Sequence, residues 1–243
     1  MKNNLIFFKT MLQAHFSKMR EVAQVSVISR RNHRWYYNNK LISSPPEGVI
    51  RWHTEMKYPH FTLNSREAVI LGNSKTVQRG VLQNAGISVP LTWFDINDIE
   101  SYPILARPQR HARGSKFYLV KNEKELKAVP YTSSWYFSEW IQKEREWRVY
   151  TGGGRVLTAF EKPVKGHLRG NIRETGSWGD LLMPPDEVCE LAVAGTQTLG
   201  LDFSGVDVIS DQNNIYVSEI NTAPMFLSIR LAEIFRDYFL SCV

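Results

Sequence analysis

The stretch that decides the fold is Gly205-Val206-Asp207-Val208-Ile209, then Asp211-Gln212-Asn213-Asn214, then Tyr216-Val217-Ser218-Glu219-Ile220-Asn221-Thr222-Ala223-Pro224. Two apolar runs flank a polar segment that is typical of a turn, which predicts a β-hairpin. Side chains alternate between the faces of a strand, so Glu219 and Asn221 point the same way. A turn centred near Asn213 places Asp207 about opposite Glu219. The hairpin thus predicts three oxygen ligands on one face of a sheet.

A set of ligands made only of oxygen suits Mg²⁺, with Mn²⁺ as a substitute. Mg²⁺ needs few protein ligands when substrate phosphates supply the rest of its shell. We therefore expect Asp207, Glu219 and Asn221 to hold a metal in a nucleotide site.

The composition is that of a globular protein: 243 residues, 43% apolar and 22% charged, with a formal net charge of +6. The positive charge favours anionic partners such as phosphates. No apolar run approaches the roughly 20 residues that cross a bilayer. Two cysteines, Cys189 and Cys242, are far apart and lie in no metal-like spacing, which favours a reducing compartment. We expect a cytoplasmic protein without membrane association.

The pattern along the chain divides it into a short N-terminal α/β lobe, residues 1–70, and a second domain, residues 71–243. The lobe is predicted as strand, helix and strand over 4–29, followed by a short strand at 49–52. In the second domain we expect helices at 75–84, 123–128, 185–200 and 228–238, and strands between 102 and 161 that include a hairpin around Thr151-Gly152-Gly153-Gly154.

The run Arg30-Arg31-Asn32-His33-Arg34-Trp35-Tyr36-Tyr37 mixes basic and aromatic side chains. Such a run can bind nucleic acid through phosphate contacts and base stacking. An exposed hairpin or loop has the same composition more often. Both interpretations stay open at this point.

An ordered series of motifs precedes the hairpin. It consists of Asn73-Ser74-Lys75, Gln83-Asn84-Ala85-Gly86-Ile87-Ser88-Val89-Pro90, Ile104-Leu105-Ala106-Arg107-Pro108 and Ser138-Glu139-Trp140-Ile141. Together with the hairpin, the series resembles the ATP-grasp superfamily, and most closely its phage and bacterial carboxylate–amine ligase-like members. The resemblance covers residues 73–226. It implies an α+β ATP-grasp fold in which two antiparallel-sheet subdomains grip ATP.

The resemblance implies nucleotide-binding roles for several residues. Arg107 stands where the family has a phosphate-binding lysine, and arginine keeps the charge but presents a planar fork. Glu146 matches the acid that holds the ribose hydroxyls, which a carboxylate accepts well. The implied ATP-binding residues are Lys75 and Arg107 for phosphates, Arg113, Gly114 and Ser115 in a phosphate-covering loop, Glu139, Trp140 and Ile141 beside adenine, and Glu146 at the ribose.

The resemblance also implies catalytic residues. Arg148 would lie near the transferred phosphate or the substrate carboxylate. Lys162 would steady the acyl-phosphate, since fixed cations stabilise charge that develops on phosphoryl oxygens. Asn171 would assist the metal or phosphate, and Asp207, Glu219 and Asn221 match the family's metal ligands. The sequence departs from the family at Met225, where glycine is frequent, and in its short first lobe. Both departures concern the substrate.

The resemblance therefore implies an ATP- and Mg²⁺-dependent, ADP-forming ligase that joins a carboxylate to an amine through an acyl-phosphate. The expected partner is a small-molecule or peptide substrate that carries a carboxylate, with a homodimer as an open option. Two alternatives remain: a small-molecule kinase of the same fold, and a protein that binds nucleotide or nucleic acid without catalysis.

Overall fold

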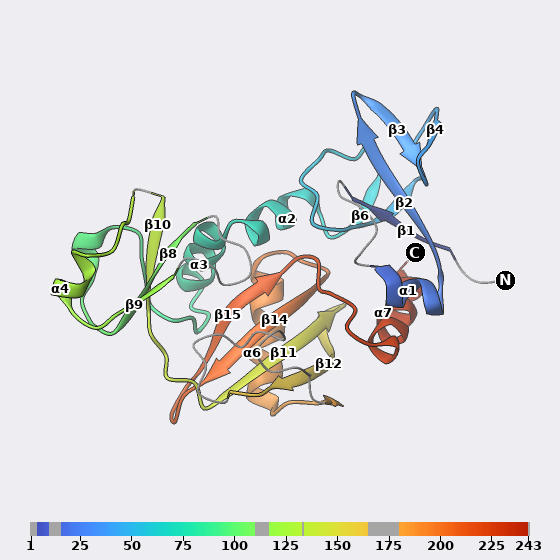
Figure 1. Cartoon of the computed structure of the whole chain (residues 1–243). Helices are drawn as coiled ribbons and strands as arrows, with labels where there is room; N and C mark the ends of the chain where they lie inside the picture. Colours follow the sequence, from blue (N-terminus) through green and yellow to red (C-terminus); the bar gives the residue numbers. More distant parts are fainter. Residues whose placement is uncertain (1–3, 10–15, 110–116, 133, 165–179, 243) are drawn as a thin grey trace.

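The structure is a computed structural model that describes residues 4–9, 16–109, 117–132, 134–164 and 180–242. Three β-sheets lie along the molecule, and the helices lie between them and against their faces (Figure 1). An N-terminal sheet is followed by a small antiparallel sheet and then by a larger antiparallel sheet.

The N-terminal sheet has six strands in the order β4-β3-β2-β1-β5-β6. Its centre is parallel, because β1 pairs in parallel with β2 and with β5, and β5 pairs in parallel with β6. Strands β3 and β4 extend it as an antiparallel ribbon. The elements are β1 (Asn4–Phe8), α1 (Ser17–Val22), β2 (Gln24–Arg31), β3 (Arg34–Tyr37), β4 (Lys40–Ile42), β5 (Gly48–Arg51) and β6 (Phe61–Leu63).

The basic and aromatic run is the β2–β3 hairpin. Its turn residues, Asn32 and His33, both have positive φ values, of 46° and 64°, as tight hairpin turns require. The guanidinium of Arg30 lies over the Trp35 ring and that of Arg31 over the Tyr36 ring, at 5.2 and 5.5 Å from the ring centroids. The hairpin interpretation is therefore confirmed.

The small sheet is antiparallel, with strand order β7-β10-β8-β9. Helices α2 and α3 connect it to the N-terminal sheet (Figure 1). Gly86 follows the end of α3 with a φ of +74°, a conformation that glycine often adopts after a helix C-terminus. Its elements are α2 (Arg66–Asn73), α3 (Lys75–Asn84), β7 (Thr92–Trp93), β8 (Ile104–Pro108), β9 (Tyr118–Val120), α4 (Glu123–Leu126) and β10 (Trp135–Glu139), with a 3₁₀ turn at Ile96–Asp98.

The larger sheet is antiparallel with strand order β13-β12-β11-β14-β15. Helix α6 packs on one of its faces, where Val188 and Ala192 meet Val206 and Val208 in a buried cluster. The β11–β12 turn uses Gly153 and Gly154 at φ values of +60° and +73°. The elements are β11 (Arg145–Gly152), β12 (Arg155–Lys162), β13 (Leu181–Leu182), α6 (Asp186–Thr198), β14 (Phe203–Ser210), β15 (Ile215–Asn221) and α7 (Ile229–Cys242).

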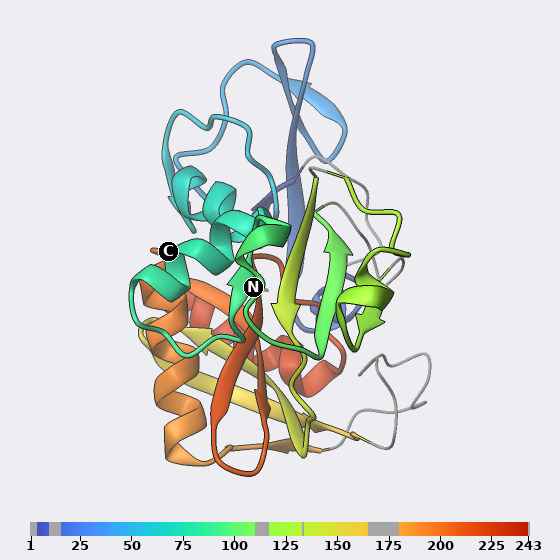
Figure 2. The ribbon, with the colours of Figure 1, turned by 90° about the vertical axis from the view of Figure 1, so that its left-hand side faces the viewer.

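One aromatic core joins the N-terminal sheet to the larger sheet. Trp52, after β5, stacks on Phe203 at the start of β14 with ring centroids 5.7 Å apart. Phe235 and Phe239 of α7 complete this buried cluster. Figure 2, turned by 90°, shows the N-terminal sheet above the larger sheet, with the small sheet in front.

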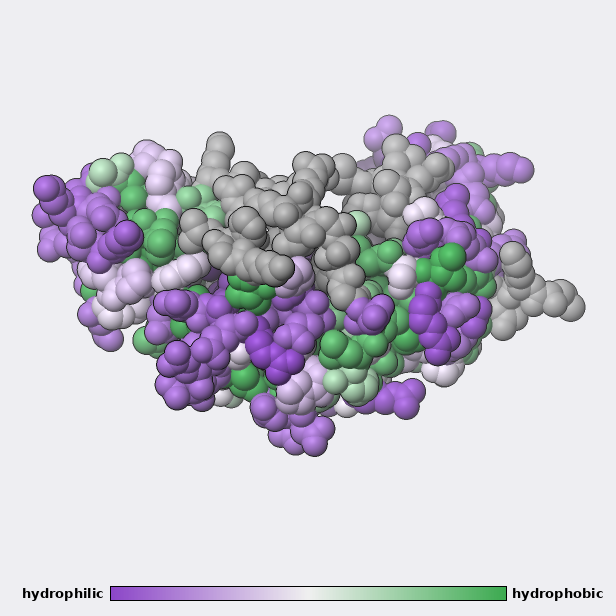
Figure 3. Space-filling model, turned by 60° about the horizontal axis from the view of Figure 1, so that its bottom comes forward, coloured by the Kyte–Doolittle hydropathy of each residue, from purple (hydrophilic) through white to green (hydrophobic). Residues whose placement is uncertain are grey.

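The structure adds elements that the sequence did not predict, notably α2 and the short strand β13. On the face drawn in Figure 3, hydrophilic side chains alternate with small hydrophobic patches. Among the described residues, no helix has the length and apolar character that crossing a membrane demands.

Candidate active site

The predicted metal ligands share one face of the larger sheet. Asp207 pairs with Glu219, and Gly205 pairs with Asn221, with a register shift after Asp207. The predicted position of Asp207 opposite Glu219 is confirmed. The alternate residues of β14, Val206 and Val208, are fully buried against α6. Strand alternation therefore separates an apolar face that anchors the sheet from a polar face that carries the site.

Two cations hold Asp207. Arg148, its partner on β11, donates through Nε to Oδ1 and through Nη2 to Oδ2, the latter at 2.8 Å. Lys162 of β12 donates to Oδ1 at 2.8 Å. Burial alone would raise the pKa of Asp207, but the charges and hydrogen bonds of Arg148 and Lys162 outweigh it, so this pKa lies below its ordinary range.

Glu146 lies at the next position on this face and also receives two cations. Lys162 donates to its Oε1 and Lys143 to its Oε2, each at 2.7 Å. Lys162 therefore bridges Glu146 and Asp207, and only about 7% of its side chain is exposed. With Lys143 and Arg148, Lys162 compensates the two carboxylates, and removal of one partner would leave an uncompensated buried charge.

Glu219 and Asn221 have fewer partners. Lys75, at the start of α3, donates to Glu219 Oε2 at 3.1 Å. The Asn221 side-chain amide donates from Nδ2 to the Gly205 carbonyl at 3.2 Å, which directs its oxygen away from that bond. Lys75 is thus brought to the predicted metal ligands from a helix about 140 residues earlier in the chain.

The donor set fits Mg²⁺. Asp207, Glu219 and Asn221 supply only carboxylate and amide oxygens, which are the ligands of a hard divalent cation. Asp207 would exchange part of its contact with Arg148 or Lys162 for the metal. Among the described residues, no group of three or more His, Cys, Asp or Glu side chains forms an alternative metal site.

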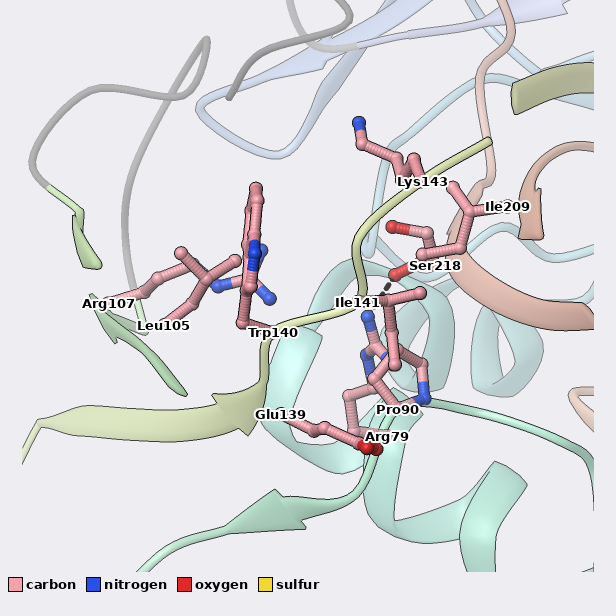
Figure 4. A pocket seen from close by; sticks show the side chains of 10 residues that line it. All are labelled: Arg79, Pro90, Leu105, Arg107, Glu139, Trp140, Ile141, Lys143, Ile209 and Ser218. Atoms are coloured by element: carbon pink, nitrogen blue, oxygen red, sulfur yellow. Dashed lines mark hydrogen bonds between the residues drawn. The ribbon is translucent and has the colours of Figure 1, made fainter. Parts of the chain in front are cut away.

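A pocket lies between the small sheet and the larger sheet (Figure 4). Arg107 and Trp140 border one side of it, and Arg79, Ile209 and Ser218 border the other. Its full lining is Arg79, Pro90, Leu105, Arg107, Glu139, Trp140, Ile141, Lys143, Ile209 and Ser218. The structure thus brings together four of the predicted nucleotide residues, Arg107, Glu139, Trp140 and Ile141.

Arg107 is positioned by β10, the strand next to β8. Its Nη2 donates to the Ser138 hydroxyl at 2.8 Å, and its guanidinium lies 5.2 Å from the Tyr136 ring centroid. Glu139 approaches Leu91, whose N–H donates to its Oε2 at 3.4 Å. These contacts fix the pocket wall that the small sheet contributes.

Sequence reasoning missed Arg79 and Lys143. Arg79 is buried in α3 and donates to the carbonyls of Val217, at 3.3 Å, and Ser218. Burial lowers its pKa to about 10. The available signal was an arginine within the helix that packs against β15. For Lys143 the signal was its position three residues before Glu146. Of the remaining predicted residues, Arg113, Gly114, Ser115 and Asn171 lie outside the described residues.

Residues 88–234, more than half of the chain, match the family model of the RimK-like ATP-grasp domain. A probable alpha-L-glutamate ligase of Parasynechococcus marenigrum (strain WH8102) is 25% identical over an alignment of 187 residues, which covers 70% of this chain and 40% of that protein. The chain therefore spans less than half the length of this relative.

Two solved structures share the fold. The ATP-grasp ligase PsnB, complexed with a minimal precursor, Mg and ADP, has a TM-score of 0.69 at 14% identity and matches 98% of this chain and 97% of its own. A RiPP-associated ATP-grasp ligase of Chryseobacterium gregarium, in complex with ADP and a leader and core peptide, has a TM-score of 0.68 at 15% identity, with 99% and 97% covered. The expected ATP-grasp fold is thereby confirmed, and the chain belongs to the RimK-like ATP-grasp family.

Proposed function

We propose that this protein is an ATP- and Mg²⁺-dependent, ADP-forming ligase that joins a carboxylate to an amine. The observation that carries the proposal is the polar face of the larger sheet. Its carboxylates, Asp207 and Glu219, face cations from three separate elements, and it lies beside the pocket between the two antiparallel sheets. Family membership supports the use of ATP.

The pocket suits a nucleotide. Arg107 offers a planar fork to phosphate oxygens, and Glu139, Trp140 and Ile141 form the wall assigned to adenine. Glu146, now held by Lys143 and Lys162, would accept the ribose hydroxyls through the same oxygens. ATP binding would therefore require one of these lysines to move toward the phosphates.

Catalysis would consist of positioning and charge stabilisation. Asp207, Glu219 and Asn221 would hold Mg²⁺, which would supply charge to neutralise the phosphates. Arg148 and Lys162 would stabilise the phosphoryl oxygens while the substrate carboxylate attacks the γ-phosphate and ADP leaves. The amine then displaces phosphate from the acyl-phosphate, so the protein needs no nucleophile of its own. Lys75 and Asn171, as predicted from the sequence, would assist at the phosphates.

The relatives support a substrate class. The probable glutamate ligase acts, by its name, on an amino acid. Of the two structural neighbours, one was solved with a minimal precursor and the other with a leader and core peptide. We therefore expect an amino-acid or peptide substrate, with glutamate as the first amine to test. The exposed Met225, beside the metal strand, would border the substrate.

The direct test is the release of ADP from ATP and Mg²⁺ in the presence of amino acids, short peptides and polyols, with product masses measured in parallel. A ligase gives an amide product in step with ADP. A phosphorylated polyol with no amide product would instead establish the kinase alternative.

The matched variants are Glu219→Gln and Glu190→Gln. Glu219 carries a predicted metal contact, so its amide should lower turnover by at least about a hundredfold, because the amide removes the charge that holds the metal. Glu190 is exposed on α6, on the opposite face of the sheet, and its amide should leave turnover unchanged. Normal ADP release by a folded Glu219→Gln variant would refute the metal assignment.

A further inference from the structure

Two buried hydrogen-bond donors lie at the carboxyl ends of β1 and β5. Lys9 is 7% exposed and Trp52 is 1% exposed. Within the described residues, neither the Lys9 ammonium Nζ nor the Trp52 indole Nε1 has a hydrogen-bond partner. Neither group belongs to the nucleotide site described above.

The two residues that carry these donors follow neighbouring strands. Phe7 pairs with Ile50, and Phe8 with Arg51, across the parallel β1–β5 ladder. The backbone N–H of Trp52 donates to the Phe8 carbonyl at 3.0 Å. Lys9 and Trp52 therefore occupy the next level of this ladder, and their side chains project from the same face. Phe16 touches both: its ring lies 5.2 Å from Lys9 Nζ and 5.5 Å from the Trp52 ring, measured to ring centroids.

Their place in the sheet is one where open α/β sheets bind ligands. The chain runs from β1 to β2 on one side, whereas β5 lies on the other side of β1. The carboxyl ends of strands where the order reverses in this way leave a crevice for a ligand. Lys9 directly follows β1, and Trp52 directly follows β5.

The same place adjoins the proposed active site. Phe226 packs against Trp52 with ring centroids 5.0 Å apart, and Asn221 precedes Phe226 by five residues, or at most about 18 Å of extended chain. Thr222 Oγ1 lies 3.4 Å from Nδ1 of His53, the residue after Trp52. A substrate bound here would therefore lie within reach of the metal-binding face.

The chemistry of the missing partner follows from these donors. A buried ammonium is strongly disfavoured unless an opposite charge compensates it. A carboxylate carries that charge and only accepts hydrogen bonds, and its two oxygens can serve two donors. Trp147 also has a buried indole nitrogen without a described partner, but its neighbouring cation, Arg145, is already paired with Glu161. Lys9 and Trp52 together therefore provide a buried positive charge and a second donor for an anion.

We propose that Lys9 and Trp52 bind a carboxylate of the substrate other than the one that is phosphorylated, and so anchor the substrate to the N-terminal sheet. This inference rests on the proposed ligase function for the identity of its ligand. It assigns the substrate to the class of amino acids or peptides with a second, unreacted carboxylate.

The test is binding of glutarate to the full chain without ATP, with neutral glutaramide as the matched probe. The Trp52 indole N–H resonance, identified by its loss in Trp52→Phe, should move downfield with glutarate and stay in place with glutaramide. Lys9→Met should weaken glutarate binding at least about tenfold, whereas Lys9→Arg should retain most of it. Lys18→Met removes an exposed lysine of the same lobe and should have no effect.

Three outcomes would overturn the proposal: a Trp52 resonance that ignores glutarate, equal binding of glutaramide, or unchanged affinity in Lys9→Met. The resonance is measured on the wild-type protein, so the proposal can be refuted even when a variant fails to fold. Glutarate binding that depends on Lys9, without any amide formation, would leave the carboxylate site standing and refute the ligase function. Amide formation without glutarate binding would support the ligase function and refute the carboxylate site.

Discussion

At the scale of single residues, the polar face of the larger sheet holds more positive than negative charge. Four cations, Lys75, Lys143, Arg148 and Lys162, meet three carboxylates, Glu146, Asp207 and Glu219. Without a nucleotide the lysines neutralise carboxylates that, in the proposed complex, face a metal and a ribose. The same cations are then available for phosphate oxygens, so one set of side chains serves both states.

Lys9 gives a prediction about stability and pH. Burial lowers the pKa of Lys9, so the folded state releases this proton more readily than the unfolded state. Stability therefore rises with pH between the lowered pKa and the ordinary value of about 10.5. Lys9→Met removes the unpaired charge and should raise the free energy of unfolding at pH 7 by about 1–3 kcal/mol.

Urea unfolding of both proteins at pH 7 and near pH 10 measures the effect. The advantage of Lys9→Met should shrink at the higher pH, because the lowered pKa lets the buried lysine lose its charge before an ordinary lysine does. An advantage that does not depend on pH would mean that packing, not charge, separates the two proteins. A more stable variant that binds substrate less well would further link the cost of Lys9 to its use.

At the scale of the elements, the sequence predicts what depends on local periodicity. The hairpin of β14 and β15 follows from two apolar runs about a polar turn, and the β11–β12 turn follows from its glycines. The register shift after Asp207, which brings Glu219 opposite it, does not follow from the number of residues in the turn. Helix α2 was missed because it has eight residues, including a glycine and an asparagine, although the Ser65 hydroxyl accepts from the Ala68 N–H at 3.1 Å, as an N-cap does.

The charged contacts of the site were predictable only in part. The residue types and their order suggested Arg148, Lys162 and Asp207. The contact of Lys162 with both Glu146 and Asp207 could not be predicted from the periodicity of the sequence. That contact depends on β14, which is distant in the chain, lying beside the β11–β12 hairpin. Arg79 likewise bonds to carbonyls of β15, almost 140 residues away, a pairing that helix spacing cannot express.

The two helical glycines near the site give a matched prediction. A Cβ at Gly72, in α2, would lie 2.4 Å from Thr222 Cγ2, whereas one at Gly80, in α3, would have nothing within 4 Å. Gly72→Ala should lower the free energy of unfolding by about 1–3 kcal/mol through overpacking. Gly80→Ala should raise it by about 0.5–1 kcal/mol, because alanine favours the helix.

Thermal or urea unfolding distinguishes the two variants. Gly72→Ala should also weaken turnover, because it presses on the segment that follows Asn221, while Gly80→Ala should not. Equal stability of the two variants would show that α2 does not pack on the end of β15 as closely as described.

At the scale of the whole molecule, Asn64 ties the N-terminal sheet to the larger sheet. It is fully buried after β6, and its Oδ1 accepts from the N–H groups of Asp202 and Phe203 at 2.7 and 3.1 Å, while its Nδ2 donates to the Phe203 carbonyl at 3.0 Å. Its φ of +64° suits asparagine better than most residues. The Asn64 side chain thus links the two sheets by hydrogen bonds, beside the aromatic core that contains Trp52.

Asn64→Ala should therefore lower the free energy of unfolding by about 3 kcal/mol, since buried backbone groups lose their partners and alanine is strained at positive φ. Asn64→Gly is the matched variant: it loses the same hydrogen bonds but tolerates the φ, so it should be less destabilised by about 1 kcal/mol.

Urea unfolding gives the free energies of both variants, and hydrogen exchange shows which part of the molecule loses stability. Protection should fall in β5 and β6 while α6 and β14 keep theirs, because the junction opens before the larger sheet does. Uniform loss of protection in both sheets would instead mean that the two sheets unfold as one unit. In that case the contacts other than those of Asn64 would suffice to hold the proposed carboxylate site at Lys9 and Trp52 against the active site.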